Sequence, residues 1–325
     1  MDLNPFSRIG RPYHGEAARL LERLQELRNL PSLPGVGYSE EISEIEARLE
    51  ALRDLQPSGA AWKTVELARH QERPQMLDYV KHLFPDFQEL HGDRLHGDDP
   101  AVVGGMAMLD GKTIMLIGHQ KGHDLKERQF HNFGMSRPEG YRKAQRLALL
   151  ADKFQMPVVT LVDTQGAFPG REAEERGQAQ AISRSLQVFA RLLVPTVAVI
   201  IGEGGSGGAL ALALCDRVYM LEHSIYSVIT PEGCAAILWR DAAEAPQAAE
   251  ALRLSAADLL SLGVIDGIIR EPGKGAHRHH GAVAKRVLRQ IQAALAETGA
   301  LTPEARRDAR RARYLSMGRF AEAKA

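Results

Sequence analysis

Apolar residues recur at helical spacing through the first sixty positions of the chain. The spacing predicts one helix over 16–30 and a second over 39–55, separated by a linker rich in proline and glycine. The apolar positions that share a face are Leu20, Leu21, Leu24 and Leu27 in the first helix and Ile42, Ile45, Leu49 and Leu52 in the second. Such stripes pack against a core or another subunit. We favour another subunit, because the pair precedes the core as a detachable arm.

From residue 102 onward the pattern alternates between strands and helices. Two apolar runs flank Asp110-Gly111, the strongest two-residue hairpin signal. The elements predicted after this hairpin are a helix over 139–154, a strand over 157–162, a helix over 172–193, a strand over 195–201, a short helix over 207–214, a strand over 217–221 and a helix ending near 297. Repeated strand, glycine-rich loop and helix predict an α/β fold.

The amino-acid composition and charge of the chain argue against several classes of protein. The chain has 325 residues, 44% hydrophobic, with 41 basic and 41 acidic side chains, so its whole surface is not a non-specific nucleic-acid binder. Cys215 and Cys234 lie in apolar surroundings without metal or redox spacing, which favours buried thiols in a reduced cytoplasmic compartment. The N-terminus does not resemble a signal peptide, and no run predicts a membrane span.

Five glycines occupy seven positions over 202–208, after an apolar run and before a helix of small residues. Because glycine has no side chain, it leaves the backbone accessible at the start of a helix, where the first N–H groups are unpaired. These N–H groups can hold a phosphate, a carboxylate or an oxyanion. A second glycine segment, residues 163–170, ends the preceding strand. The two segments, 166–168 and 207–208, are therefore expected to frame one cavity.

Three other interpretations of these glycines remain open, and the first is that they only let helix and strand pack closely in a non-catalytic scaffold. Gly202, Gly204 and Gly207, with Glu222 about 20 residues on, satisfy a dinucleotide fingerprint. The short apolar helix, the late position in the chain and the second glycine segment argue against it. Gly204, Ser206 and Gly208 also match the G-x-S-x-G pattern of a nucleophile elbow, with Ser206 as the nucleophile. A hydrolase would draw its other triad members from Asp258, Asp266, His277, His279 and His280.

Three polar segments have both a functional and a plain interpretation. Residues 277–280 could ligate a metal or could be ordinary polar residues at the protein surface. Loop 119–123 could bind a coenzyme A phosphate or a carrier protein, or could be solvated. The basic tail is expected to be a solvated helix face rather than an anion site; its arginines are Arg306, Arg307, Arg310, Arg311 and Arg313.

A series of motifs over residues 40–295 resembles the carboxyltransferase alpha subunits of bacterial acetyl-CoA carboxylases. The family pattern has proline where this chain has Gln165, while the flanking Gly166 and Gly170 are kept. The motifs, in order, are RP at 73–74, LDYV at 77–80, GDR at 92–94, VGG at 103–105, GHQKG at 118–122, NFGM at 132–135, PEGYRKA at 138–144, DTQGAFPG at 163–170, EERGQ at 174–178, GEGGSGGALAL at 202–212 and YSVITPEGC at 226–234.

The resemblance implies a fold and a domain division. The fold would be the crotonase-like spiral of ββα units of the ClpP/crotonase superfamily, with an N-terminal helical arm and C-terminal helices. Residues 1–38 would form the arm and linker, residues 39–296 the carboxyltransferase domain, and residues 297–325 a basic C-terminal tail.

The resemblance also implies an activity: transfer of a carboxyl group from carboxybiotin, held on a separate protein, to acetyl-CoA. The product, malonyl-CoA, commits carbon to fatty acid biosynthesis. The backbone of Gly207 and Gly208 would form an oxyanion hole for the biotin carbonyl, and no metal would be needed in this chain. The accompanying residues would be Gly204, Gly205 and Ser206 at the catalytic segment, and Gly166, Ala167, Phe168 and Gly170 at the substrate-binding segment.

Several partners follow from the same resemblance. A zinc-ribbon beta subunit would supply a second oxyanion hole for the thioester in an α2β2 assembly. A biotin carboxyl carrier protein would present the biotin, and a biotin carboxylase would load it. The ureido nitrogen of biotin would take the methyl proton, so no side-chain base is required.

Overall fold

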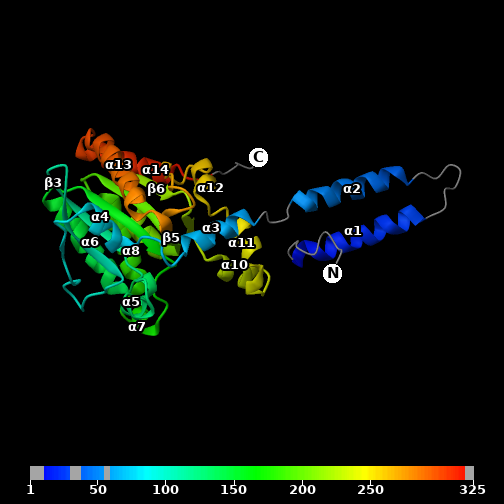
Figure 1. Cartoon of the computed structure of the whole chain (residues 1–325), viewed down its shortest axis with the longest axis horizontal. Coiled ribbons are helices and arrows are strands. Elements are labelled where there is room, and N and C mark those ends of the chain that lie inside the picture. Colours follow the sequence, from blue (N-terminus) through cyan, green and yellow to red (C-terminus); the bar gives the residue numbers. More distant parts are fainter. Residues whose placement is uncertain (1–10, 30–37, 55–58, 319–325) are drawn as a thin grey trace, which may run out of the picture. The chain divides into compact units, whose positions relative to one another are not determined.

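The computed structural model describes residues 11–29, 38–54 and 59–318 and divides into two compact units. One unit contains Met1–Lys63 and Pro231–Arg253, and the other contains Thr64–Thr230 and Leu254–Ala325 (Figure 1). No helix in the described ranges has both the length and the apolar character that crossing a membrane requires. The second unit contains the sheet and both glycine segments.

The sheet of the second unit is mixed. Its order is β1-β2-β3-β4-β5-β6-β8, with β7 paired to β5; only the β1–β2 and β2–β3 pairs are antiparallel. The strands are β1 Gln88–Glu89, β2 Val102–Leu109, β3 Lys112–His119, β4 Val158–Thr164, β5 Thr196–Gly205, β6 Arg217–Leu221, β7 Ile225–Ser227 and β8 Gly267–Ile269. The predicted hairpin is confirmed: Asp110 and Gly111 have φ of +50° and +75°, as the favoured two-residue turn requires. Because β3 to β6 are parallel, their carboxyl ends share one edge.

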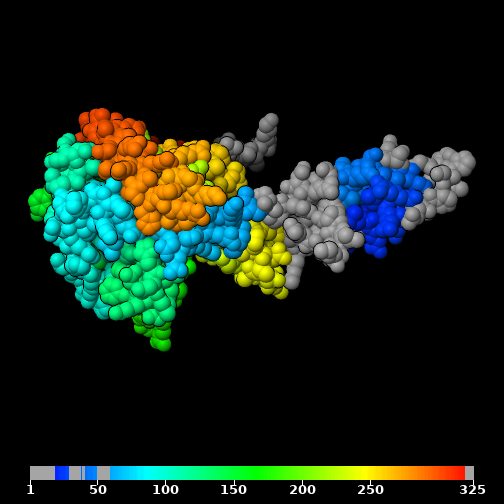
Figure 2. Space-filling view, in the orientation of Figure 1, coloured from blue at the N-terminus to red at the C-terminus, as the bar shows by residue number. Residues whose placement is uncertain are grey.

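Helices cover both faces of this sheet. On one face α6, α8 and α9 bury the first core cluster, and on the other α4 and α13 bury the second (Figure 1). Figure 2 shows the side of the unit on which the orange segment of α13 and the cyan segment of α4 lie at the surface. The helices with residues in this unit are α3 Ala60–Ala68, α4 Met76–Leu83, α5 Leu125–Phe130, α6 Pro138–Lys153, α7 Arg171–Glu175, α8 Gln178–Arg191, α9 Ser206–Ala213, α12 Ala256–Ser261, α13 His280–Gly299 and α14 Pro303–Leu315. Helix α3 begins in the first unit, and three short 3₁₀ turns lie at 132–134, 242–244 and 276–278.

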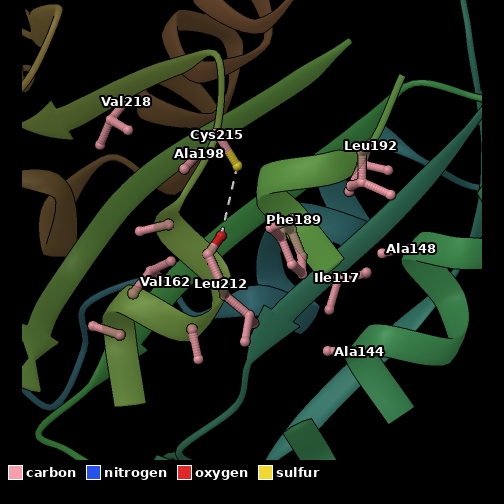
Figure 3. Close-up of a cluster of buried hydrophobic side chains, with 14 of the residues drawn as sticks. Ile117, Ala144, Ala148, Val162, Phe189, Leu192, Ala198, Leu212, Cys215 and Val218 are labelled. Atoms are coloured by element: carbon pink, nitrogen blue, oxygen red, sulfur yellow. Dashed lines mark hydrogen bonds between the residues drawn. The ribbon is translucent and has the colours of Figure 1, made fainter. Parts of the chain in front are cut away.

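Strand β5 shows why both faces are apolar. Ala198 and Ile200 enter the first cluster, while Val197, Val199 and Ile201 enter the second, as the two-residue repeat of a strand requires. In the first cluster the thiol of Cys215 points toward the carbonyl oxygen of Leu212 (Figure 3). Both cysteines are free and buried, which confirms the expectation of buried thiols.

Two elements differ from the predicted ones. The helix expected over 172–193 is broken into α7 and α8, because Gly177 adopts a left-handed φ of +80° between them. The expected glycine turn is largely strand, since β5 continues through Gly205 and pairs there with β7. The chain therefore reverses into α9 at a single residue, Ser206, whose φ is +57°.

The first unit contains α1 Arg11–Asn29, α2 Ser39–Asp54, α10 Pro231–Leu238 and α11 Ala245–Leu252. Of the predicted stripes, Leu24 and Leu27 of α1 and Ile45 and Leu49 of α2 are buried against each other, while the side chain of Leu52 lies outside the described residues. Our preference for another subunit as their partner was therefore wrong for these four side chains. For these four side chains, pairing of the two helices within the chain supplies the apolar contacts.

The basic tail also differs from its expected solvated state. Within α14, Arg310 is 2% exposed and pairs through both carboxylate oxygens with Asp216. Arg306 donates to the carbonyl oxygens of Thr298, Leu193 and Leu301. These arginines lie where helix and strand ends leave carbonyls unpaired, so they attach α14 to the second unit.

Candidate active site

The two glycine segments meet at the carboxyl edge of β4 and β5. A Cβ built on Gly208 would lie 2.7 Å from the amide nitrogen of Ala167 and 2.8 Å from the carbonyl carbon of Gly166. A Cβ on Gly205 would overlap the carbonyl oxygen of Gln165. The close approach of the two backbones therefore requires glycine at both positions.

Unpaired N–H donors lie where these two segments meet, at residues 165–167 and 205–208, which we call the glycine junction. The first amides of α9, from Ser206 to Gly208, have no acceptor within the helix, and the residue before them, Gly205, has no side chain to cap them. Among the described residues the Ala167 amide also lacks a hydrogen-bond acceptor. The positive end of the α9 dipole adds to these donors. The arrangement can bind an oxygen that becomes negative during a reaction.

The other predicted glycines differ in what surrounds them. Gly207 is open, since a Cβ there would meet only Ile182, at 3.4 Å. Gly204 lies against the ring of Tyr226, so its lack of a side chain serves packing beside the site. Gly170 lies against the ring of Phe168. The described contacts of this pair do not include the α9 glycines.

Phe168 anchors its segment from outside the glycine junction. Its amide donates to the carbonyl of Ser136 at 3.0 Å, and the guanidinium of Arg137 lies 4.8 Å from its ring centre. Gln178 donates to its carbonyl oxygen at 3.0 Å. These contacts fix where the amide of Ala167, one residue earlier, points.

Sequence reasoning missed an ion network at the same edge. The Lys121 ammonium lies 2.6 Å from Asp163 and 2.7 Å from Glu203, and Arg69 pairs with Glu203 at 2.7 Å. Asp163 also accepts the Glu203 amide at 2.8 Å. The network ties the end of β3 to those of β4 and β5, beside Gly202. Asp163 and Glu203 lie inside the two glycine motifs and Lys121 lies inside the GHQKG motif, which were the available signals.

The charges of this network are held in place. Burial acts to raise the pKa of Glu203, but Lys121 and Arg69 outweigh it and lower the pKa to about 2. Burial acts to lower the pKa of Lys121, and the two carboxylates raise it above its ordinary value. The acids are therefore ionised and paired. They stabilise the strand ends and do not offer a free base.

The loop expected to bind a phosphate is partly buried. His119 belongs to β3, is fully buried, and has a pKa lowered to about 3 by burial and by Lys121, so it carries no charge for an anion. Lys121 points into the ion network. His123 bonds to Asp78 and to the backbone of Gln71. Phosphate binding by this loop stays a prediction, without His119 and Lys121 as ligands.

The geometry weakens the competing interpretations. Glu222, the acid of the dinucleotide fingerprint, is held by Arg270 and by the amide of Glu271. Asp266 accepts from Val218 and pairs with Arg313, so it is not directed at a catalytic histidine.

The other polar candidates are also engaged. Asp258 bonds to Ser255 near the start of α12, and His277 stacks on His70 with ring centres 4.1 Å apart. Within the described ranges no three side chains of metal-ligating type are grouped, so residues 277–280 do not form such a site there.

Comparison with solved structures defines the class of the fold. The transcarboxylase 12S core, solved with methylmalonyl-CoA, superposes with a TM-score of 0.58 at 19% identity over 83% of this chain and 47% of that one. A Pseudomonas malonate decarboxylase hetero-tetramer in complex with coenzyme A gives 0.57 at 21% identity over 74% and 98%. The chain therefore has the crotonase-like α/β fold of carboxyltransferases, as the family resemblance implied.

Comparison of sequences then defines the family. Residues 12–318 match the family described as acetyl co-enzyme A carboxylase carboxyltransferase-like. The acetyl-coenzyme A carboxylase carboxyl transferase subunit alpha of Geobacter metallireducens is 53% identical over 304 residues, 93% of this chain and 95% of that protein. The same subunit of Azoarcus sp. is 50% identical over 306 residues, 94% and 95%. The chain belongs to the family of acetyl-CoA carboxylase carboxyltransferase alpha subunits.

Proposed function

We propose that this chain is the alpha half of a carboxyltransferase that moves a carboxyl group from carboxybiotin to acetyl-CoA and so forms malonyl-CoA. The observation that carries the proposal is the contact of Gly208 with the backbone of Gly166 and Ala167, in a chain half identical to named alpha subunits. A second supporting feature is that the buried acids beside it are already paired. Such a site favours charge stabilisation over side-chain acid–base catalysis.

The proposed role of the chain is to hold one oxygen. The amides of Gly207 and Gly208, with that of Ala167, donate to the ureido carbonyl oxygen of the biotin substrate. That oxygen gains charge as the bond from nitrogen to the carboxyl carbon breaks. When bound, carboxybiotin would supply the CO₂ and, through its ureido nitrogen, the acceptor of the acetyl-CoA methyl proton, so that the carbanion could take up that CO₂. Donors that bind the developing charge better than the resting carbonyl lower the barrier.

The proposed assembly divides these tasks among several chains. A zinc-ribbon beta subunit provides the thioester site, a biotin carboxyl carrier protein presents the biotin, and a biotin carboxylase loads it, all in the cytoplasm. Residues 39–296 carry the carboxyltransferase domain, with 1–38 as the arm and 297–325 as the tail. We propose an α2β2 complex, without a metal in this chain.

Reconstitution tests the proposal. The purified chain is mixed with a beta-type subunit, and malonyl-CoA formation from acetyl-CoA and carboxylated biotin carrier is followed by mass spectrometry. We expect product from the mixture and none from either subunit alone. Absence of product from a well-formed hetero-oligomer would refute the function, and product from the alpha chain alone would refute the proposed division of sites.

A further inference from the structure

The hydroxyl of Tyr141 is buried without a hydrogen-bond partner. Tyr141 lies in the first turns of α6, has no exposed surface, and packs in the first core cluster. Its hydroxyl is among the buried polar atoms for which the described structure provides no acceptor or donor. A buried unpaired hydroxyl costs free energy, and phenylalanine would fill the same volume without that cost. The hydroxyl therefore calls for an explanation other than packing.

The position of this hydroxyl relates it to the glycine junction. It lies 2.8 Å from the point that a Cβ of Gly208 would occupy, and the amide nitrogen of Ala167 lies 2.7 Å from the same point. One hydroxyl and one unpaired amide thus lie against Gly208 at the start of α9, so close that any side chain there would overlap both. Both are donors, and neither has an acceptor among the described residues.

The start of α6 holds Tyr141 in this place. Asp99 accepts from the hydroxyl of Ser136 at 3.0 Å and from the amide of Arg137 at 2.7 Å, just before the helix begins. Gly140 has no room for a side chain against Ser136 and Asp99. Burial, and then the charge of Asp99, raise the pKa of Tyr141 above its ordinary value, so the hydroxyl keeps its proton.

We propose that Tyr141 is a further catalytic residue, whose hydroxyl donates to the same substrate oxygen as the amides at the glycine junction. This inference rests on the proposed function and adds a side-chain donor to it. The hydroxyl acquires its missing acceptor when that oxygen, carrying its developing negative charge, binds beside Gly208. An unpaired donor held in place before the reaction needs little reorganisation during it, which is the basis of stabilisation by preorganised groups.

Tyr79 supplies a matched control. It is also fully buried, and its hydroxyl also lacks a partner. It belongs to α4 and to the second core cluster, on the other face of the sheet. None of the glycines of the junction has the Tyr79 hydroxyl among the nearest neighbours of its Cβ position. Tyr79→Phe and Tyr141→Phe therefore each remove one buried, unpaired hydroxyl, and only Tyr141 borders the junction.

The test compares both variants with the wild-type chain after assembly with the beta-type subunit. Tyr141→Phe is expected to lower kcat by on the order of 10- to 100-fold, at or below the range for loss of one oxyanion-hole donor, with KM for the biotin substrate within about twofold. Tyr79→Phe should leave both constants within about twofold of wild type. The thermal midpoint of each variant should equal or exceed that of wild type, because each loses an unpaired buried hydroxyl.

Each other outcome would overturn either this inference or the proposed function. A wild-type kcat in Tyr141→Phe would overturn this inference and leave the proposed function intact. A loss of kcat accompanied by a lower thermal midpoint, or an equal loss in Tyr79→Phe, would assign the tyrosine a structural role and also overturn it. No transfer by the wild-type assembly would be a failure of the proposed function, and would be seen before any variant is compared.

Discussion

The glycine junction and helix α14 differ in whether the backbone polar groups around them are paired in hydrogen bonds. At the junction, small residues leave the amides of Gly208 and Ala167 without acceptors in the described structure. At α14, every guanidinium nitrogen of Arg306 and of Arg310 donates, and together they satisfy carbonyls of Leu192 and other residues nearby.

The difference separates stability from function. Completed hydrogen bonds stabilise the folded unit, since breaking one leaves a buried group unpaired. Unpaired donors do not stabilise it, but they are available to a ligand. Changes at α14 should therefore alter unfolding, and changes at the junction should alter the rate of reaction.

The largest expected effect on stability is at Arg310. Arg310→Ala leaves Asp216 buried without its ion pair and several carbonyls without donors. We expect the free energy of unfolding to fall by about 3–5 kcal/mol, the usual result of breaking a buried pair. Urea unfolding followed by circular dichroism measures it.

Arg311 is the control on the same helix, because it is exposed. Arg311→Ala should change the free energy of unfolding by less than about 0.5 kcal/mol. Equal effects of the two substitutions would mean that α14 is a solvated helix after all, and the comparison would fail.

A slightly smaller effect is expected at Glu203, as a loss of stability in acid. Its pKa is about 2 in the folded chain and about 4.5 ordinarily, so its contribution is complete above pH 4.5 and disappears as pH falls through 2. The difference corresponds to about 3 kcal/mol. Between pH 5 and pH 2, wild type should therefore lose more unfolding free energy than Glu203→Gln, whereas exposed Glu304→Gln should follow wild type. Parallel pH profiles for wild type and Glu203→Gln would contradict the network.

The smallest effect is expected at Glu222, which is paired with Arg270 at the edge of the unit and is not at the glycine junction. Glu222→Ala should leave the assembled enzyme within a few-fold of wild type, as for other partly exposed ion pairs. Calorimetry should detect no NAD(H) binding at millimolar concentration. Micromolar affinity that disappears in Glu222→Ala would restore the dinucleotide interpretation and remove the carboxyltransferase one.

Local signals in the sequence were enough for most of the fold. The turn at Asp110-Gly111 and the helix over 139–154, observed as α6, were predicted correctly, since each depends on neighbours along the chain. The break at Gly177 was missed because the apolar repeat continues across it, and one glycine does not by itself end a predicted helix.

Features that depend on distant residues could not be predicted. The ion network joins Arg69, Lys121, Asp163 and Glu203, and no spacing rule connects such positions. The buried arginine Arg310 was expected in solvent because arginine is seldom buried unless paired, and its partner lies 94 residues away. The glycine segments were identified from sequence, but only the structure places Gly208 against Ala167.

The most direct test of the central claim is the carboxyl transfer rate of Gly208→Val in the assembled enzyme. Its side chain would occupy the space between the Ala167 amide and the donors of α9. We expect at least about a 100-fold loss of kcat, as for a lost oxyanion-hole donor, with the hetero-oligomer intact. Gly281→Val, in α13 with nothing within 4 Å of its Cβ position, should retain the wild-type rate. Near-normal transfer by a folded, assembled Gly208→Val enzyme would contradict the claim that this junction holds the reacting oxygen.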